Sequence, residues 1–334
     1  MAKSAIVPVL CLIEAILQFF ITPPTFAQLT KVKTSYSALT ANLTAYWLAK
    51  EAKLFEKQGL DVDVVLIESG VTTIQALVAG ETQIAMGGGT VAVSSGLAGG
   101  DLISIASIEN RFPYALVALK EIRSVEQLKG RRHAISRFGS VSDLGSRLIF
   151  QRYGLVPDKD ITFLQIGGTS TRLAALNART VESTILTPEF FLLAKKAGFT
   201  ILIDPTQYRI DFPQLDVITS RAFAKSRPDV VTRYLRSIVE GIHLFKNDRE
   251  ASIRAMSKYL RIQDREALEE TYRIYREIYQ PIPFPSPAAI QTQLTSMAQR
   301  DPRAKEAKPE QFMDPTFLKE IEKGDSSRSC IRSK

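Results

Sequence analysis

Cysteine and histidine are scarce in this chain of 334 residues, which has two of each. Cys11 lies in an N-terminal apolar segment and Cys330 close to the C-terminus, so we expect no internal disulfide and a fold that depends on its core. His133 and His243 have no second ligand type nearby at a metal-binding spacing. We therefore predict no metal site and no cofactor.

Catalytic motifs are also missing. The sequence has no HExxH, CxxC, GxSxG or phosphate-binding P-loop, and no GxGxxG follows a strand-like segment. The net charge of +8 is scattered among acidic residues and does not form a basic stripe with aromatics. These absences predict no catalytic residues, no enzymatic activity and no nucleic-acid partner.

The first 27 residues differ from the rest. Lys3 precedes an apolar run over 5–21, and Ala27 ends a short segment that follows two prolines. This pattern predicts a signal peptide, 1–27, cleaved near Ala27, and hence export to the periplasm. The run is interrupted by polar residues and is shorter than the roughly 20 apolar residues of a spanning helix. A retained anchor is the alternative.

Short strand-like and helix-like segments alternate through the middle of the chain, which predicts an α/β fold with parallel sheets. The predicted strands are 31–36, 60–67, 83–86, 102–107, 133–136, 161–165, 182–186 and 200–203, and the predicted helices between them include 43–55, 91–97, 144–153, 172–178 and 190–197. After 215–219 the pattern becomes helical, and Ser286 is expected to cap the last clear helix. Residues 325–334 are predicted to be a flexible tail.

An internal similarity suggests two related lobes. The segment ALVAGETQIAMGGGT, 76–90, aligns with ALNARTVESTILTPE, 175–189, through the shared pattern Ala-Leu-x-Ala and a following strand. A match this short also arises by chance. If the two segments are equivalent, each lobe has a helix, a turn, a strand and a loop at the same place.

Four loops rich in small polar residues follow strands and open helices: 37–44, 87–90, 136–143 and 186–189. Ligands bind at this edge of open α/β sheets, where hydroxyls and free helix N–H groups are available. The alternative for each loop is helix capping alone, and we expect Ser142 to cap its helix. Asp143, in the first turn, would repel an anion there and favours a neutral or cationic ligand, unless its carboxylate points into solvent. The run 167–171 is predicted to be a turn.

Several segments in order resemble one family. They are YWLAKEAKLFEKQGLDVDVV at 46–65, ALVAGETQIAMGGG at 76–89, VEQLKGRRHAISRFGSVSD at 125–143 and LQIGGTSTRLAAL at 164–176. They are similar to the substrate-binding proteins of nitrate/sulfonate/taurine-type ABC importers, also called thiamine-pyrimidine-synthase-like. The resemblance covers about 31–318.

The resemblance implies a two-lobed periplasmic-binding-protein clamshell of type II. Lobe one would comprise 28–119 plus 214–324, and lobe two 120–213. A small polar or aromatic organic molecule would bind between the lobes of a monomer. Closure would then present the protein to the membrane permease and ATPase of an ABC importer. The alternative is an enzyme on the same scaffold, acting on a pyrimidine or menaquinone precursor.

The resemblance also implies the residues that contact the ligand. By position, the family's cleft loops correspond to Ser37, Asn42, Gly88, Thr90, Ser140, Ser142 and Thr187. Phe138 is added because an aromatic ring beside the loops could stack on a flat ligand. The Arg179 turn departs from the glycine usual in the family. The related synthases carry a cysteine cluster and an active-site histidine, and the related dehydratases lack an export leader, which favours the binding protein.

Overall fold

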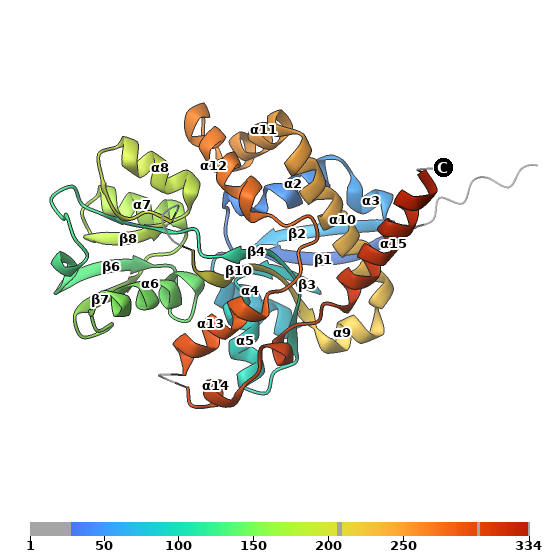
Figure 1. Cartoon of the computed structure of the whole chain (residues 1–334), viewed down its shortest axis with the longest axis horizontal. Helices are drawn as coiled ribbons and strands as arrows, with labels where there is room; N and C mark the ends of the chain where they lie inside the picture. The colour runs from blue at the N-terminus through green and yellow to red at the C-terminus, as the bar shows by residue number, and fades with distance from the viewer. Residues whose placement is uncertain (1–27, 206–208, 299–300, 333–334) are drawn as a thin grey trace, which may run out of the picture.

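Two five-stranded sheets form the centre of the computed structural model, which describes residues 28–205, 209–298 and 301–332, with side chains described to Gly324. Figure 1 shows the two sheets in separate bodies, here called the first and the second lobe. The first sheet contains β1 (Thr30–Tyr36), β2 (Leu60–Leu66), β3 (Ile84–Gly87), β4 (Leu102–Arg111) and β10 (Asp211–Ser220). The second contains β5 (Ala115–Ala118), β6 (Arg131–Ile135), β7 (Ile161–Gln165), β8 (Ser183–Leu186) and β9 (Thr200–Ile203). The predicted signal peptide lies outside the described residues.

The two sheets have the same topology. Their strand orders are β2-β1-β3-β10-β4 and β7-β6-β8-β5-β9. The first three strands of each are parallel, and the fourth, β10 or β5, is antiparallel to both of its neighbours. β3 and β8 occupy equivalent places, so the sequence similarity between 76–90 and 175–189 reflects equivalent structure.

The predicted parallel sheets are therefore wrong in one strand each. The chain crosses from one sheet to the other between β4 and β5 and again between β9 and β10. A strand that arrives directly from the other lobe enters at the edge where the parallel strands end, so it must run in the opposite direction. The lobe boundaries predicted from the sequence remain a prediction.

Helices cover both faces of each sheet (Figure 1). Those before β9 are α2 (Thr44–Glu51), α3 (Leu54–Lys57), α4 (Gly70–Val78), α5 (Gly89–Leu97), α6 (Val141–Arg152), α7 (Thr169–Asn177) and α8 (Pro188–Lys196), with short 3-10 helices η1 (Ala41–Leu43) and η2 (Glu126–Leu128). The predicted helix 43–55 is divided into η1, α2 and the start of α3, because Lys53 adopts a left-handed backbone with φ of 53° that ends α2.

The helical region after β10 completes the first lobe. It comprises α9 (Arg221–Ser226), α10 (Pro228–Asn247), α11 (Arg249–Leu260), α12 (Arg265–Ile278), α13 (Pro287–Met297), α14 (Arg303–Glu306), η4 (Pro309–Phe312) and α15 (Thr316–Arg332). Ser286 caps α13 as predicted, since its hydroxyl accepts the N–H of Ala289. The sequence did not predict α15, whose side chains beyond Gly324, where a tail was expected, are not described.

The two lobes have separate hydrophobic cores. The first core includes the buried stripe of α10, from Val231 to Phe245, together with Trp47 and Tyr46 of α2. Trp47 stacks on Tyr259 with ring centroids 4.6 Å apart, so both α2 aromatics pack in the core. The second core draws only on residues between 112 and 212 as its fully buried members. Each lobe therefore has the apolar packing to act as a rigid body.

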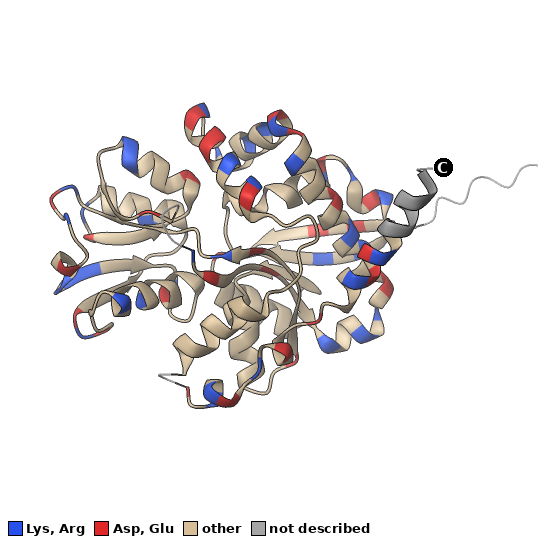
Figure 2. Cartoon of the chain, in the orientation of Figure 1, with Lys and Arg blue, Asp and Glu red and all other residues tan. Residues whose placement is uncertain are grey.

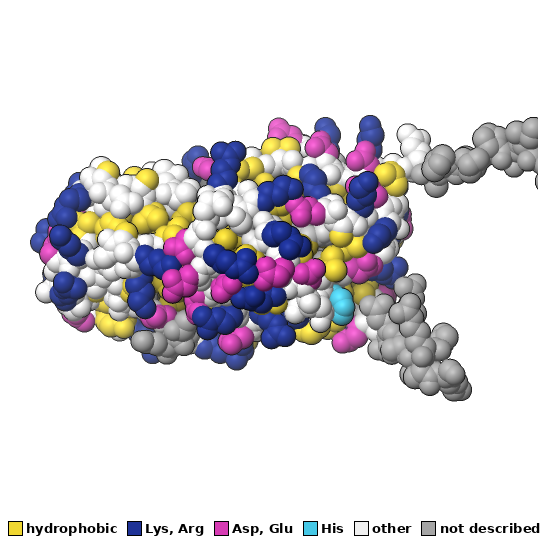
Figure 3. Space-filling model, turned by 90° about the horizontal axis from the view of Figure 1, so that it is seen from above, with side chains coloured by type: hydrophobic (Ala, Val, Ile, Leu, Met, Phe, Trp, Pro, Cys, Tyr) yellow, Lys and Arg dark blue, Asp and Glu magenta, His cyan; other side chains and the backbone are white. Residues whose placement is uncertain are grey.

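Lys, Arg, Asp and Glu residues are frequent on the outer helices (Figure 2). On the face shown in Figure 3, basic and acidic side chains are interleaved. Ion pairs of charged residues on the helices after β10 include Arg249 with Glu269 and Arg265 with Glu250. In the described part of the chain no helix has the length and apolarity needed to cross a membrane.

Candidate functional site

A cavity of about 60 Å³ lies between the two lobes. It is lined by Ser37, Ala38, Thr40, Asn42, Leu43, Ser69, Gly70, Gly88, Thr90, Tyr114, Ser136, Ser140, Val141, Ser142, Gly168, Thr169, Arg172, Gln214 and Leu215. One water needs about 10–15 Å³ of accessible volume, so the cavity accepts a group of several non-hydrogen atoms. Small and hydroxyl-bearing residues dominate its wall because they follow strand ends, where the chain turns into helices.

Four helices begin at this cavity: α4, α5, α6 and α7. Their first residues leave backbone N–H groups without helical partners, and the aligned peptide dipoles give each N-terminus a partial positive charge. Two helices come from each lobe. The backbone alone therefore gives the site a positive electrostatic potential. When the two lobes close, the four helix N-termini lie around the same cavity.

Six of the eight residues predicted to contact the ligand line the cavity: Ser37, Asn42, Gly88, Thr90, Ser140 and Ser142. That they touch a ligand stays a prediction. The other two lie elsewhere. Phe138 is 48% exposed and lines a separate groove, and its backbone N–H donates to Gln165 Oε1. Thr187 is fully buried and does not line the cavity; its hydroxyl donates to Glu189.

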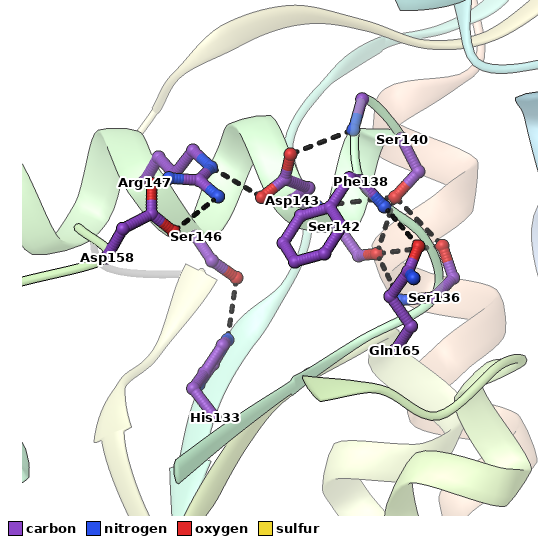
Figure 4. A network of polar contacts seen from close by, with 11 residues as sticks. His133, Ser136, Phe138, Ser140, Ser142, Asp143, Ser146, Arg147, Asp158 and Gln165 are labelled. Atoms are coloured by element: carbon purple, nitrogen blue, oxygen red, sulfur yellow. Dashed lines mark hydrogen bonds and ion pairs between the residues drawn. The ribbon is translucent and has the colours of Figure 1, made fainter. Parts of the chain in front are cut away.

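The serines of the second lobe form one hydrogen-bonded cluster at the start of α6. Ser140 is the N-cap, because its Oγ accepts the N–H of Asp143 at 3.3 Å; the prediction that Ser142 caps this helix is wrong. Ser142 lies one residue inside the helix, and its Oγ accepts the N–H of Ser136 at 2.8 Å. Figure 4 shows the hydroxyls of Ser136, Ser140 and Ser142 meeting within hydrogen-bond distance of one another, and all three residues line the cavity.

Asp143 does not face the cavity. Its Oδ1 lies 2.5 Å from Arg147 Nε, and its Oδ2 accepts the N–H of Gly139 at 2.8 Å. Arg147 also forms a two-pronged pair with Asp158, and Figure 4 shows Asp143 turned toward Arg147. The sequence-based expectation that Asp143 would repel an anion is therefore wrong, because its charge is neutralised within the second lobe.

Arg172, which the sequence did not single out, supplies a positive charge to the cavity. It is 2% exposed, and its guanidinium donates to the carbonyls of Gly167 and Ile185 and to the hydroxyl of Thr169. Burial lowers its pKa to about 10, so it is still charged at neutral pH. Among the described residues that line the cavity, it alone is charged. The run 167–171, predicted to be only a turn, also contributes Gly168 and Thr169 to the wall.

Several buried polar atoms of the cavity wall have no hydrogen-bond partner. They are Ser69 Oγ, Thr90 Oγ1, Arg172 Nε and Gln214 Oε1. A buried donor or acceptor without a partner costs about 1–3 kcal/mol. Four such atoms lie in the residues of one cavity wall, so hydrogen-bonding capacity is left over at this place in the fold.

The walls of the cavity touch across the two lobes. A Cβ added at Gly88 of the first lobe would lie 2.2 Å from Val141 Cγ2 of the second. Farther out, Lys196 of α8 lies 2.8 Å from carboxylate oxygens of both Asp264 and Glu266 in the first lobe. The structure therefore has the lobes closed over the cavity.

The sequence of this two-lobed chain matches the family model described as NMT1/THI5 like over residues 40–252, well over half of its length. The chain belongs to the NMT1/THI5-like family. The match spans β3, the start of α6 and the Arg172 helix, and thus most of the cavity wall.

Relatives of this NMT1/THI5-like chain are known as binding proteins. YtlA of Bacillus subtilis (strain 168), a candidate binding protein, is 22% identical over 224 residues, which is 66% of this chain and 67% of YtlA. The alkanesulfonate-binding protein SsuA of Xanthomonas axonopodis pv. citri is 19% identical with a TM-score of 0.68, covering 85% of this chain and 96% of SsuA. The nitrate-binding protein NrtA of Synechocystis PCC 6803 is 15% identical with a TM-score of 0.71, covering 89% of each chain. These structural matches establish the shared two-lobed fold.

Histidine has a structural role in this member of the NMT1/THI5-like family. His133 is fully buried, its ring nitrogens bonded to the hydroxyls of Ser183 and Ser146, and burial lowers its pKa to about 3. His243 is exposed on α10. No group of three or more potential metal ligands occurs within the described ranges.

Proposed function

We propose that this protein is an extracytoplasmic solute-binding protein that captures a small ligand between its lobes and delivers it to the permease and ATPase of an ABC importer. The observation that carries the proposal is the closed cavity whose wall both lobes share. Opening the lobes admits the ligand, and closing them buries it. The sulfonate- and nitrate-binding names of the structural relatives support the same role.

The ligand we propose carries a negative charge. Arg172 and the N-termini of four helices provide positive potential, and Asp143 is directed away. The unpaired Arg172 Nε can donate to an anionic oxygen, and the hydroxyls of Ser69 and Thr90 can do the same. The volume of about 60 Å³ favours a small oxyanion group over a large aromatic molecule.

The route to the site of action is also part of the proposal. The leader, 1–27, would direct export and be cleaved near Ala27, and the mature protein would act as a monomer in the periplasm. Lobe one would comprise 28–119 with 214–324, and lobe two 120–213. The binding-protein names of the relatives favour this function over an enzyme that acts on a pyrimidine or a menaquinone precursor.

A thermal-shift screen tests the function and the ligand class together. The mature protein would be heated with nitrate, alkanesulfonates, carboxylates, pyrimidines and amines in turn. A compound present at 100 times its dissociation constant should stabilise the folded protein by about 2.7 kcal/mol. We expect the shift with small anions, and its loss in Arg172→Met. A protein that shows no shift but converts one of these compounds to a product would be an enzyme.

A further inference from the structure

Two buried carboxyl groups from opposite lobes meet beside the cavity. Glu109 lies near the end of β4, and Glu189 in the first turn of α8; neither is accessible to solvent. Asn42 Nδ2 donates to Glu109 Oε2 at 2.7 Å, and the N–H of Ala41 donates to Glu189 Oε1 at 3.1 Å. Because Ala41 and Asn42 are consecutive residues, closure brings the two carboxyls to the same short segment of the first lobe.

These carboxyls have too few partners for two negative charges. Thr187 also donates to Glu189 Oε1 at 2.9 Å, but Glu109 Oε1 and Glu189 Oε2 have no hydrogen-bond partner. No salt bridge to either carboxyl is found in the part of the chain that is described. An unpaired charge buried in this way is very costly, so a neighbouring pair of this kind retains a proton.

The groups that surround Glu109 and Glu189 do not supply a positive charge that would let both carboxyls ionise. The phenols of Tyr114, Tyr275 and Tyr279 interact with both carboxyls but are themselves neutral, since burial raises their pKa values. Arg172, the cation of the cavity wall, is bound to carbonyls and a hydroxyl rather than to either carboxylate. Burial raises the pKa of Glu189 to about 7, and burial followed by the charge of Glu189 holds that of Glu109 well above its usual range.

We propose that the Glu109 and Glu189 pair takes up a proton when the lobes close, so that ligand capture and proton binding are coupled. The coupling rests on the proposed function, because it is lobe opening that separates Glu189 from Ala41. In the open form Glu189 would meet water and return toward its ordinary pKa of 4.5. The proton is thus a second ligand of the closed form, and each ligand strengthens the binding of the other.

The direction of the effect follows from the raised pKa in the closed form. Closure is strongest below pH 4.5, where both forms hold the proton. It weakens by up to about tenfold per pH unit as the pH rises from 4.5 toward about 7. Above that value neither form holds the proton, and the effect levels off. The total span is on the order of a hundredfold or more in the closing equilibrium.

The cavity offers a way to lock the closed form without any ligand. The Cβ built at Gly88 lies 3.6 Å from Val141 Cβ, which is within the spacing of about 3.5–4.5 Å for a disulfide. Gly88→Cys with Val141→Cys, in the mature chain that also carries Cys330→Ser, would therefore hold the lobes together when oxidised. Carbon-13 NMR of side-chain-labelled glutamate then follows each carboxyl with pH in the oxidised and the reduced protein.

In the oxidised protein we expect Glu109 to titrate above its usual range and Glu189 to titrate with a midpoint near 7. The midpoint near 7 identifies Glu189. It should disappear in Glu189→Gln, in which the amide oxygen still accepts the N–H of Ala41, and persist in the control Glu81→Gln on the exposed surface. Reduction should return the midpoint toward 4.5. Ordinary midpoints for every glutamate in the oxidised protein would overturn the proposal, as would an elevated midpoint unchanged by reduction or a disulfide that does not form. These measurements need no ligand, so they are independent of the thermal-shift screen.

Discussion

One added methyl group at Gly88 should weaken ligand binding while leaving the ligand-free protein almost as stable as before. Gly88 has φ of −61° and ψ of 128°, which alanine adopts without strain. In the closed form its Cβ would lie 2.2 Å from Val141 Cγ2, whereas carbon atoms in contact are about 3.5–4.0 Å apart. The lobes must then separate by roughly 1.5 Å, or Val141 must leave its preferred rotamer.

The size of the effect follows from the cost of overpacking. Inserting a methyl into a packed contact costs about 1–3 kcal/mol. Since each 1.4 kcal/mol is a factor of ten, Gly88→Ala should raise the dissociation constant by about 5- to 150-fold. The clash at 2.2 Å falls on the closed form, because Val141 belongs to the other lobe. Within the first lobe the added Cβ would lie 3.3 Å from Thr90 Oγ1, a tight contact that a small shift relieves. The melting temperature without ligand should therefore change little.

Calorimetric titration with the compound identified by thermal shift measures this effect. Val141→Ala in the same chain should restore most of the affinity, since the two Cβ atoms would be 3.6 Å apart, an ordinary contact. Gly70→Ala is the matched control, because a Cβ there meets no atom nearer than 3.7 Å. Unchanged affinity in Gly88→Ala, or a double variant no better than the single one, would refute a closed liganded state with these walls in contact.

Three further predictions concern buried and packed positions. Burial raises the pKa of Asp216 from 3.8 to about 6, so ionisation of this carboxyl lowers the free energy of unfolding as the pH rises from about 4 to above 6. In urea unfolding, Asp216→Asn should therefore be more stable than wild type by about 3 kcal/mol at pH 8, and the two proteins should be similarly stable at pH 4. Gly241→Ala would place a Cβ 2.2 Å from a backbone carbonyl oxygen of α2 and should destabilise the protein by about 1–3 kcal/mol. Gly324→Ala, where the new Cβ would meet nothing within 4 Å outside the surrounding turns of α15, should stabilise it by up to about 1 kcal/mol, and equal effects of the two substitutions on unfolding would contradict the close packing at Gly241. The double variant Ser140→Ala with Ser142→Ala should lower the free energy of unfolding by about 1 kcal/mol through loss of the cap, as measured in thermal melts. It should reduce the free energy of ligand binding, as measured by calorimetry, by more than this. Equal losses in the two measurements would mean that the serines act only as structural residues.

Much of the fold is readable from the sequence because strand and helix periodicities are local. β1, β2 and β7 lie within one residue of their predicted ends, and the aligned segments 76–90 and 175–189 correctly indicated repeated architecture. The antiparallel direction of β5 and β10 was not readable, since it depends on which lobe the chain arrives from. The break at Lys53 also escaped prediction, because a lysine with positive φ leaves no mark in the apolar pattern.

The site was predictable where it depends on strand ends and small residues, which is why six of the proposed contacts reached the cavity wall. Arg172 was missed because its position is fixed by carbonyls from two distant segments. The misjudged Asp143 did carry a local signal. Arg147 follows it by four residues on the same helix, a spacing typical of an ion pair that takes the charge out of the cleft.

Because β4 and β10 are neighbours in the first sheet, the segment between them, which forms the second lobe, could be replaced as one unit. The chain leaves the first lobe after β4 and returns to it at β10, and these strands are antiparallel neighbours. The N–H of Phe112 donates to the carbonyl of Ile210 at 3.0 Å, so the departing and returning chains meet at one hydrogen bond. A short turn between these residues would give a single-lobed protein with an intact sheet. Recombination at the same two points would graft another relative's half of the cavity, with Arg172 replaced by its counterpart, onto an unchanged first lobe.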